Sequence, residues 1–181
     1  MRDRTDKEVD VKMARSLKET AIGNLHLREE DAFEFFVAYA RYEYAAKVCK
    51  LVHQGDEQRM LTINPQGVAD RIRASFESRI SSDKSLQKAV AYYTAQPPQR
   101  QIWDGNGPGW DQPVYQGNDT LKNLLLQLAQ ARNNLFHGGK GWKADNPAME
   151  RDNDLLRHGL VILDAVVNSD DQLFGEFSSF A

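Results

Sequence analysis

The residues with the clearest capacity for chemistry are Arg132, Asn133 and His137, which Gly138 and Gly139 follow at once. An arginine guanidinium can hold a phosphate at two points, and a histidine can move a proton at neutral pH. These two groups at the end of a leucine-rich helix, with no cluster of metal ligands nearby in the sequence, favour phosphodiester chemistry. A structural interpretation stays open, in which His137 is a helix C-terminal cation that faces the helix dipole and Asn133 is polar surface.

The spacing of the motif raises a geometric problem. Arg132 falls in the leucine stripe of its helix, four residues after Leu128 and three before Leu135. A charge on an apolar stripe is costly unless it is paired or holds a ligand. On a regular helix Arg132 and His137 are separated by about 140° around the axis. Either the last turn unwinds before Gly138, or two copies of the helix meet across a two-fold axis and pool their residues.

The rest of the chain predicts a helical scaffold for this motif. Apolar spacings of three and four residues predict helices over residues 7–25, 32–52, 65–80, 84–95, 119–137 and 148–167. Residues 96–118 are rich in Gly, Pro and Trp and predict a long loop, which is either functional or pinned to the core by its aromatic rings. No segment shows the alternation of a strand. We therefore expect one all-α domain over residues 1–181, a helical bundle.

The helix expected over residues 32–52 is apolar on two sides. One stripe consists of Phe33, Phe36, Val37, Ala40, Tyr44, Val48 and Leu51. A second stripe consists of Phe35, Tyr39, Tyr42 and Ala46. A helix that is apolar on two sides is expected to be buried on both, and in a domain of this size the second face is suited to another chain. Of the two ways to bring Arg132 and His137 together, this favours a dimer over an unwound last turn.

Composition restricts the class of protein. The net charge is -3, which argues against broad electrostatic binding of nucleic acid, but residues 132–143 carry Arg132, Lys140 and Lys143 and no acid. The chain has no apolar run that would span a bilayer, and its charged first residues do not resemble a signal peptide. The single cysteine, Cys49, fits a reducing compartment. We expect a cytoplasmic protein with no membrane contact.

The sequence Arg132-Asn133-x-x-x-His137 at the end of a helix resembles the signature of the HEPN superfamily (higher eukaryotes and prokaryotes nucleotide-binding). The earlier segment Ala40-Arg41-Tyr42-Glu43-Tyr44-Ala45-Ala46-Lys47 also looks like the acidic, aromatic helix that precedes the motif in many members. The resemblance implies an HEPN-like helical bundle. It further implies a homodimeric, metal-independent endoribonuclease without a cofactor, found as a toxin or in anti-phage defence, with an antitoxin or defence protein as partner.

The resemblance also implies residue roles. Arg132 would stabilise charge on the scissile phosphate, His137 would act as general acid or base, and Asn133 would orient His137 or hold a phosphate oxygen. Attack by the RNA 2′-hydroxyl would leave a 2′,3′-cyclic phosphate without any metal. Glu43 would orient Arg132 or the histidine, or else form an ordinary salt bridge. A further set, either substrate contacts on the RNA backbone and bases or a solvated loop, consists of Lys140, Trp142 and Lys143.

Two functions therefore stand as expectations. The first is a ribonuclease with a composite Arg/His site at a homodimer interface. The alternative is a catalytically inactive HEPN-type module that binds a nucleotide or a protein. One departure bears on the partner: Gly139 occupies the position where members paired with a nucleotidyltransferase antitoxin carry the tyrosine that is modified, which argues against that partner.

Overall fold

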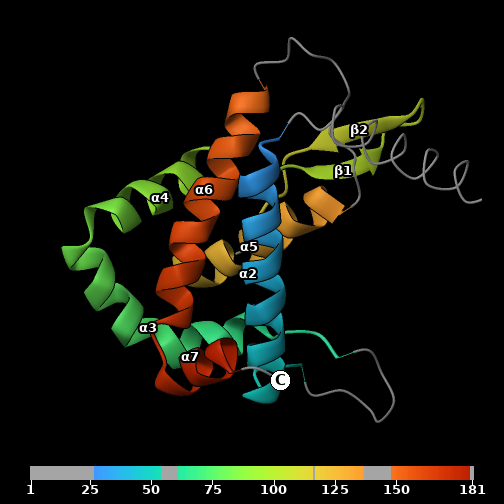
Figure 1. The fold of residues 1–181 in the computed structure, drawn as a ribbon. Coiled ribbons are helices and arrows are strands. Elements are labelled where there is room, and N and C mark those ends of the chain that lie inside the picture. Colours follow the sequence, from blue (N-terminus) through green and yellow to red (C-terminus); the bar gives the residue numbers. More distant parts are fainter. Residues whose placement is uncertain (1–26, 54–60, 116, 137–147, 180–181) are drawn as a thin grey trace, which may run out of the picture.

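The computed structural model describes residues 27–53, 61–115, 117–136 and 148–179 (Figure 1). This part of the chain holds six helices and one two-stranded antiparallel sheet. The elements are α2 (Glu29–Val48), α3 (Pro65–Ser82), α4 (Lys84–Ala95), β1 (Arg100–Trp103), β2 (Pro108–Asp111), α5 (Thr120–Phe136), α6 (Ala148–Val167) and α7 (Asp171–Ser178). The predicted helix over residues 7–25 lies outside the described residues. The expectation of a mostly helical fold is confirmed.

Short polar side chains set where several helices begin. The Asn64 side chain accepts hydrogen bonds from the backbone N–H groups of Gln66 (3.1 Å) and Gly67 (3.2 Å), directly before Pro65 at the first helical position. Asp83 caps α4 in the same way, and Asp170 caps α7 through the N–H of Leu173 at 2.8 Å. Each cap satisfies N–H groups that a helix start leaves without a partner.

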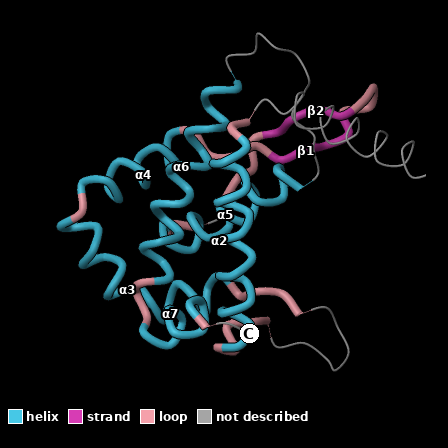
Figure 2. The backbone as a smooth tube through the Cα atoms, viewed as in Figure 1, coloured by secondary structure: helices cyan, strands magenta, loops and turns pink. Residues whose placement is uncertain are grey.

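Helix α6 lies at the centre of the bundle (Figures 1 and 2). It packs against α4 on one side and α2 on the other, while α5 packs against α3. The core contains large side chains from every helix of the described chain, among them Phe35, Ile72, Tyr93, Leu128, Ile162 and Leu173. At Gly159 of α6 the contact is so close that an added Cβ would lie 2.7 Å from Cε2 of Phe35 and 2.5 Å from the Tyr93 hydroxyl.

The last described helix is fastened to the first by Arg41. Its guanidinium donates hydrogen bonds to the carbonyl oxygens of Glu176 (3.1 Å), Phe177 (2.9 Å) and Ser179, at the C-terminal end of α7. A cation at that end satisfies carbonyls that lack a helical partner and opposes the helix dipole. Arg41 therefore joins elements that lie at opposite ends of the described chain.

The two apolar stripes of α2 have unequal environments. Phe35, Tyr39, Tyr42 and Ala46 are buried, whereas the other stripe is exposed, with Phe33 at 69%. Within this single chain only one of the two faces is covered, because α6, α5 and α7 pack around one side of α2. The helix also ends at Val48 rather than residue 52, since Lys50 adopts the left-handed backbone (φ 60°).

Two elements were not expected from the sequence. Residues 100–111 form the β1–β2 hairpin instead of an irregular loop, so the expectation of no strand is wrong. The Asp104 carboxylate accepts hydrogen bonds from the N–H groups of Asn106 and Gly107, and Gly105 takes the positive φ that the turn requires. The short helix α7 was also missed. No helix in the described ranges is long and apolar enough to cross a membrane.

Candidate functional site

Helix α5 carries the motif, and its first turn is strongly anchored. The Asp119 carboxylate accepts a hydrogen bond from the N–H of Lys122 at 3.1 Å and pairs with Arg73 at 2.7 Å. The Arg73 guanidinium holds the pKa of Asp119 well below its ordinary value. Buried leucines fix the rotation of the helix about its axis: Leu121, Leu124, Leu125 and Leu128. These contacts determine where the residues of the last turn point.

Arg132 is fixed by three neighbours at the other end of α5. Its Nη2 lies 2.6 Å from Oε2 of Glu43 on α2, and its Nη1 donates to Oδ1 of Asn133 at 2.9 Å. The guanidinium carbon also lies 5.3 Å from the ring centroid of Tyr39, a cation–π distance. The Arg132 side chain is 30% exposed and that of Glu43 is 25% exposed. The guanidinium is thus oriented by contacts and still reaches solvent.

The charges around Arg132 keep Glu43 ionised. Partial burial alone would raise the pKa of Glu43, but hydrogen bonds from Arg132 and Lys47 outweigh it and hold that pKa below 4.5. The Lys47 Nζ lies 3.2 Å from the second carboxylate oxygen of Glu43. Burial raises the pKa of Tyr39 to about 12, although Arg132 opposes the rise. The cluster at neutral pH is therefore arginine, carboxylate and lysine around an un-ionised tyrosine ring.

The structure brings together three of the residues expected in the site: Arg132, Asn133 and Glu43. It also explains why the charge of Arg132 is tolerated on the leucine stripe, because Glu43 forms an ion pair with it. The other expected site residues, His137, Lys140, Trp142 and Lys143, lie outside the described residues. Sequence reasoning missed Tyr39 at this cluster. A usable signal exists, since Tyr39 stands four residues before Glu43 and so shares its helix face.

The long loop is tied to α5 directly beside the motif. Asn134 donates a hydrogen bond to the Gln99 carbonyl at 2.7 Å and accepts one from Gln130 at 2.9 Å. The loop is fixed a second time where Arg151 donates to the Pro97 carbonyl at 2.8 Å. These anchors position the β1–β2 hairpin at the motif end of α5. On the hairpin, Trp103 is 72% exposed, so this ring does not pin the loop to the core.

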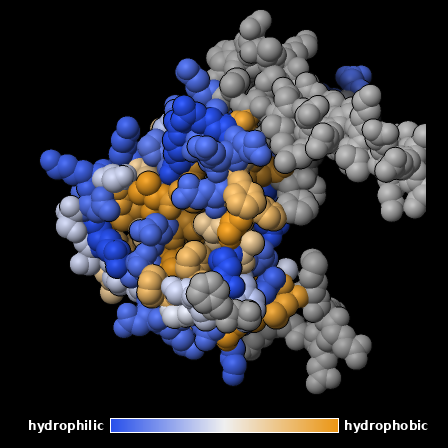
Figure 3. All heavy atoms as spheres, in the orientation of Figure 1, coloured by the Kyte–Doolittle hydropathy of each residue, from blue (hydrophilic) through white to orange (hydrophobic). Residues whose placement is uncertain are grey.

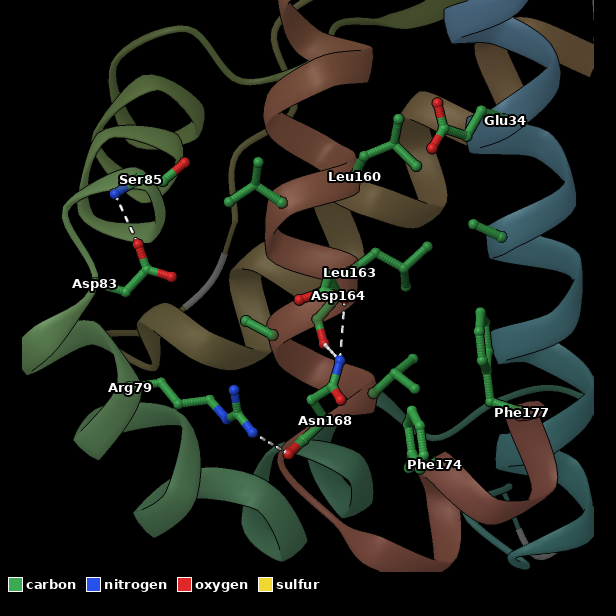
Figure 4. A pocket seen from close by; sticks show the side chains of 14 residues that line it. Glu34, Arg79, Asp83, Ser85, Leu160, Leu163, Asp164, Asn168, Phe174 and Phe177 are labelled. Carbon is green, nitrogen blue, oxygen red and sulfur yellow. Dashed lines mark hydrogen bonds between the residues drawn. The ribbon is translucent and has the colours of Figure 1, made fainter.

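A separate cavity of about 510 Å³ opens on another face of the bundle. Figure 3 shows apolar atoms gathered in a hollow between the α3–α4 corner and α2. In the closer view, Leu160 and Leu163 of α6 and Phe174 and Phe177 of α7 line it (Figure 4). None of the described residues expected in the site lines this cavity.

The polar rim of this cavity is mainly acidic. Glu34, Asp83 and Asp164 contribute carboxylates, and the Arg79 guanidinium is turned to the Asn168 carbonyl at 2.6 Å (Figure 4). Three carboxylates around an apolar floor repel the phosphates of a nucleotide. The cavity therefore does not suit a nucleotide, which is one of the two kinds of ligand expected for the alternative function. No group of three His, Cys, Asp or Glu side chains among the described residues is arranged to hold a metal ion.

Comparison with known proteins identifies no relative: no family model, no curated protein and no solved structure matches this chain. The HEPN interpretation consequently depends on the motif residues and on the helix order. The contact that bears on it most directly is the one between α5 and α2 at Arg132 and Glu43.

Proposed function

We propose that this protein is a metal-independent endoribonuclease of the HEPN type, which acts as a homodimer in a toxin–antitoxin or anti-phage defence system. The observation that supports the proposal is the orientation of Arg132. Glu43, Asn133 and Tyr39 hold its guanidinium at the end of α5, five residues before His137. A cation fixed before the substrate arrives stabilises developing charge without reorganising, which is the most effective electrostatic contribution to catalysis.

The proposed reaction needs only the RNA and the protein. His137 of one copy accepts the proton of the RNA 2′-hydroxyl, whose oxygen attacks the neighbouring phosphorus. The bond from phosphorus to the 5′-oxygen breaks, and that oxygen takes a proton from the histidine of the other copy. The products are a 2′,3′-cyclic phosphate and a free 5′-hydroxyl. Arg132 would hold the non-bridging phosphate oxygens, and Asn133 would orient the reacting groups.

Glu43 has a positioning role in this scheme. Its carboxylate occupies one edge of the Arg132 guanidinium and fixes the plane of the group. A planar guanidinium can engage carboxylate and phosphate through different N–H groups, whereas a lysine presents a single point charge. Lys140, Trp142 and Lys143 would contact the RNA backbone and stack against a base.

One observation favours the alternative function, a non-catalytic binding or assembly module. Glu43 and Tyr39 already satisfy the charge of Arg132, as they would if the arginine only joined α5 to α2. In that case Arg132→Ala weakens binding or assembly, and there is no RNA cleavage to lose. The acidic cavity rim makes a protein a better ligand for such a module than a nucleotide.

The deciding experiment is cleavage of total cellular RNA by the purified protein in excess EDTA. His137→Ala is compared with His53→Ala, which alters an exposed histidine outside the motif. We expect cleavage that survives the chelator, is lost in His137→Ala and persists in His53→Ala. Cleavage that persists in His137→Ala contradicts the proposal. An absence of cleavage by the wild-type protein, together with Arg132-dependent capture of a partner, supports the binding module.

A further inference from the structure

The exposed stripe of α2 extends from Phe33 to the last residue of the helix, Val48. Phe33 is 69% exposed, and Val37, Tyr44 and Val48 are each 41–42% exposed. Ala40 is exposed between them, so the stripe follows spacings of three and four residues. Such spacing is that of a helix that packs along a second helix. At 1.5 Å per residue the stripe is about 23 Å long. A continuous apolar surface of this kind is typical of a protein interface.

The charges of α2 lie mostly towards its two ends, since Arg41 and Glu43 between them are engaged with α7 and with Arg132. The first turn carries Glu29, Glu30 and Asp31, and Glu34 follows, whereas the last turn carries Lys47 and Lys50 comes just after it. A second α2 that lies parallel would place acid beside acid and base beside base. An antiparallel α2 places the acidic end of each helix beside the basic end of the other. Charge complementarity therefore selects the antiparallel arrangement with a copy of the same chain.

We propose that two copies of this protein dimerise through an antiparallel α2–α2 interface, which we call the α2 seam. The part of the stripe from Phe33 to Tyr44 is symmetric about a point between residues 38 and 39, and Val48 falls beyond it. Phe33 then lies opposite Tyr44 of the partner subunit, and Val37 lies opposite Ala40 of the partner subunit. A large ring meets a large ring at the ends, and a small residue at the centre permits close approach. A self-complementary patch of this kind is what a two-fold dimer requires.

The seam borders the Arg132 cluster. Glu43 follows Phe36 by seven residues and precedes Lys47 by four, so these residues share the edge of the stripe that faces α5. A two-fold axis perpendicular to antiparallel helices leaves matching edges on the same side of the seam. The two Glu43 residues would be about 14 Å apart along the helix direction. A parallel pair would place them on opposite sides.

An antiparallel dimer of this kind would bring motif residues of two copies together, which the spacing of Arg132 and His137 on one helix requires. Both Arg132–Glu43 pairs would lie on one face of the dimer, so that Arg132 and Asn133 of both copies would border one composite site. That consequence depends on the proposed function, whereas the seam itself depends only on the exposed stripe and the charges. A single helix pair is small for a specific interface, below about 1,200 Å² of total buried surface. We therefore expect a dimer that dissociates at micromolar concentrations.

The first test uses single cysteines as distance probes on the full chain. Ala40→Cys lies near the two-fold axis, where an antiparallel pair brings the two copies within reach of a disulfide. Phe33→Cys places its two copies about 16 Å apart along the helix direction, which a disulfide cannot span. We expect oxidation to link Ala40→Cys as a dimer but not Phe33→Cys, nor the wild-type protein, whose only cysteine, Cys49, is buried. Equal linkage of Ala40→Cys and Phe33→Cys would indicate parallel helices and overturn the proposal.

The second test compares two glutamates added at exposed apolar positions. Val37→Glu places like charges across the centre of the seam, whereas Val114→Glu adds the same charge at a residue that is 90% exposed on the long loop. We expect light scattering over a range of concentrations to show a dimer for the wild type and Val114→Glu. Val37→Glu should be monomeric with an unchanged helical circular dichroism spectrum. A wild-type protein that is monomeric at every concentration, or a Val37→Glu dimer of undiminished affinity, overturns the seam.

These readouts are independent of the RNA assay. A linked antiparallel dimer that cleaves no RNA would retain the α2 seam and remove the ribonuclease proposal. RNA cleavage by a strictly monomeric protein would overturn the α2 seam and the two-copy site of the proposed function, but not the ribonuclease activity itself.

Discussion

Arg132 and Glu43 are 89 positions apart in the chain, yet their side chains meet at 2.6 Å between Nη2 and Oε2. The contact joins α5 to α2 and fixes the one charge that interrupts the leucine stripe. It is the point at which the stability of the fold and the proposed chemistry depend on the same atoms. A substitution of Arg132 or Glu43 therefore has to be tested for its effect on stability and, separately, for its effect on RNA cleavage.

Glu43→Gln should lower stability in a pH-dependent way. The folded state holds the pKa of Glu43 below 4.5, so the unfolded chain binds the proton first as the pH falls. The stabilisation is therefore complete at neutral pH and is lost as the pH falls through the lowered pKa. We expect Glu43→Gln to cost about 1–2 kcal/mol at about pH 7 and progressively less as the pH falls through the lowered pKa of Glu43.

Urea unfolding at several pH values measures this difference. Asp111→Asn is the control, since it breaks the ion pair to Arg100 at 2.9 Å in which both side chains are exposed. We expect this control to change stability by less than about 0.5 kcal/mol. An equal cost of Glu43→Gln at neutral and acidic pH would show that its carboxylate charge is not what stabilises the contact.

Arg132→Lys should retain the fold and lose RNA cleavage. A lysine keeps the positive charge beside Glu43 but cannot bond Glu43 and Asn133 as a planar fork does. Loss of one positioned donor at a transition state typically costs on the order of 100-fold or more in rate. Single-turnover cleavage and thermal unfolding of the same preparation measure both effects. Full activity in Arg132→Lys would remove the guanidinium from the proposed mechanism.

Gly159→Ala should destabilise the core strongly. An added Cβ would lie 2.5 Å from the Tyr93 hydroxyl and 2.7 Å from Cε2 of Phe35, and both side chains are fully buried. Relief requires shifts in a packed interior, so we expect a loss of about 2–3 kcal/mol. Gly175→Ala is the matched control, because nothing lies within 4 Å of its added Cβ. This second change in α7 should be neutral or stabilise by up to about 1 kcal/mol in the same urea titration.

Asp119 combines a helix cap with an ion pair, and two variants distinguish these roles. Asp119→Asn keeps an oxygen that can accept from the N–H of Lys122, but removes the charge that faces Arg73. Asp119→Ala removes both, and we expect it to cost about 1 kcal/mol more than Asp119→Asn at neutral pH. Denaturant unfolding provides the measurement. Equal stability of the two variants would show that the cap contributes nothing beyond the charge.

The local features of the fold are predictable from the sequence because they depend on neighbouring residues. Asn64 before Pro65, Asp83 and Asp119 are of residue types that favour the start of a helix, and each caps one. The β1–β2 hairpin also has a local signal, the turn of Asp104 with Gly105, but its short strands lack the alternation that identifies a strand. Helix α7 was missed for a similar reason, since eight residues give too little periodicity.

Features that depend on distant contacts could be predicted only in part. The sequence shows two apolar stripes on α2 but not which of them faces the core. Phe35, Tyr39 and Tyr42 are buried because α5, α6 and α7 happen to pack on that side, and this is a property of the whole fold. The pairing of Glu43 with Arg132 was expected as one of two roles for Glu43. The cation–π contact of Tyr39 followed only from the three-dimensional arrangement.

The fastening of α7 to α2 by Arg41 has a consequence for synthesis on the ribosome. Contacts of α2 with α6 and α7 join residues 125–136 positions apart. A ribosome adds about 5–20 residues per second, so α2 emerges roughly 6–27 seconds before the residues that cover its inner face. During that interval Phe35 and Tyr42 are exposed as well as Phe33 and Val37. Among the described helices, α2 is therefore the one that waits longest for the residues that cover it.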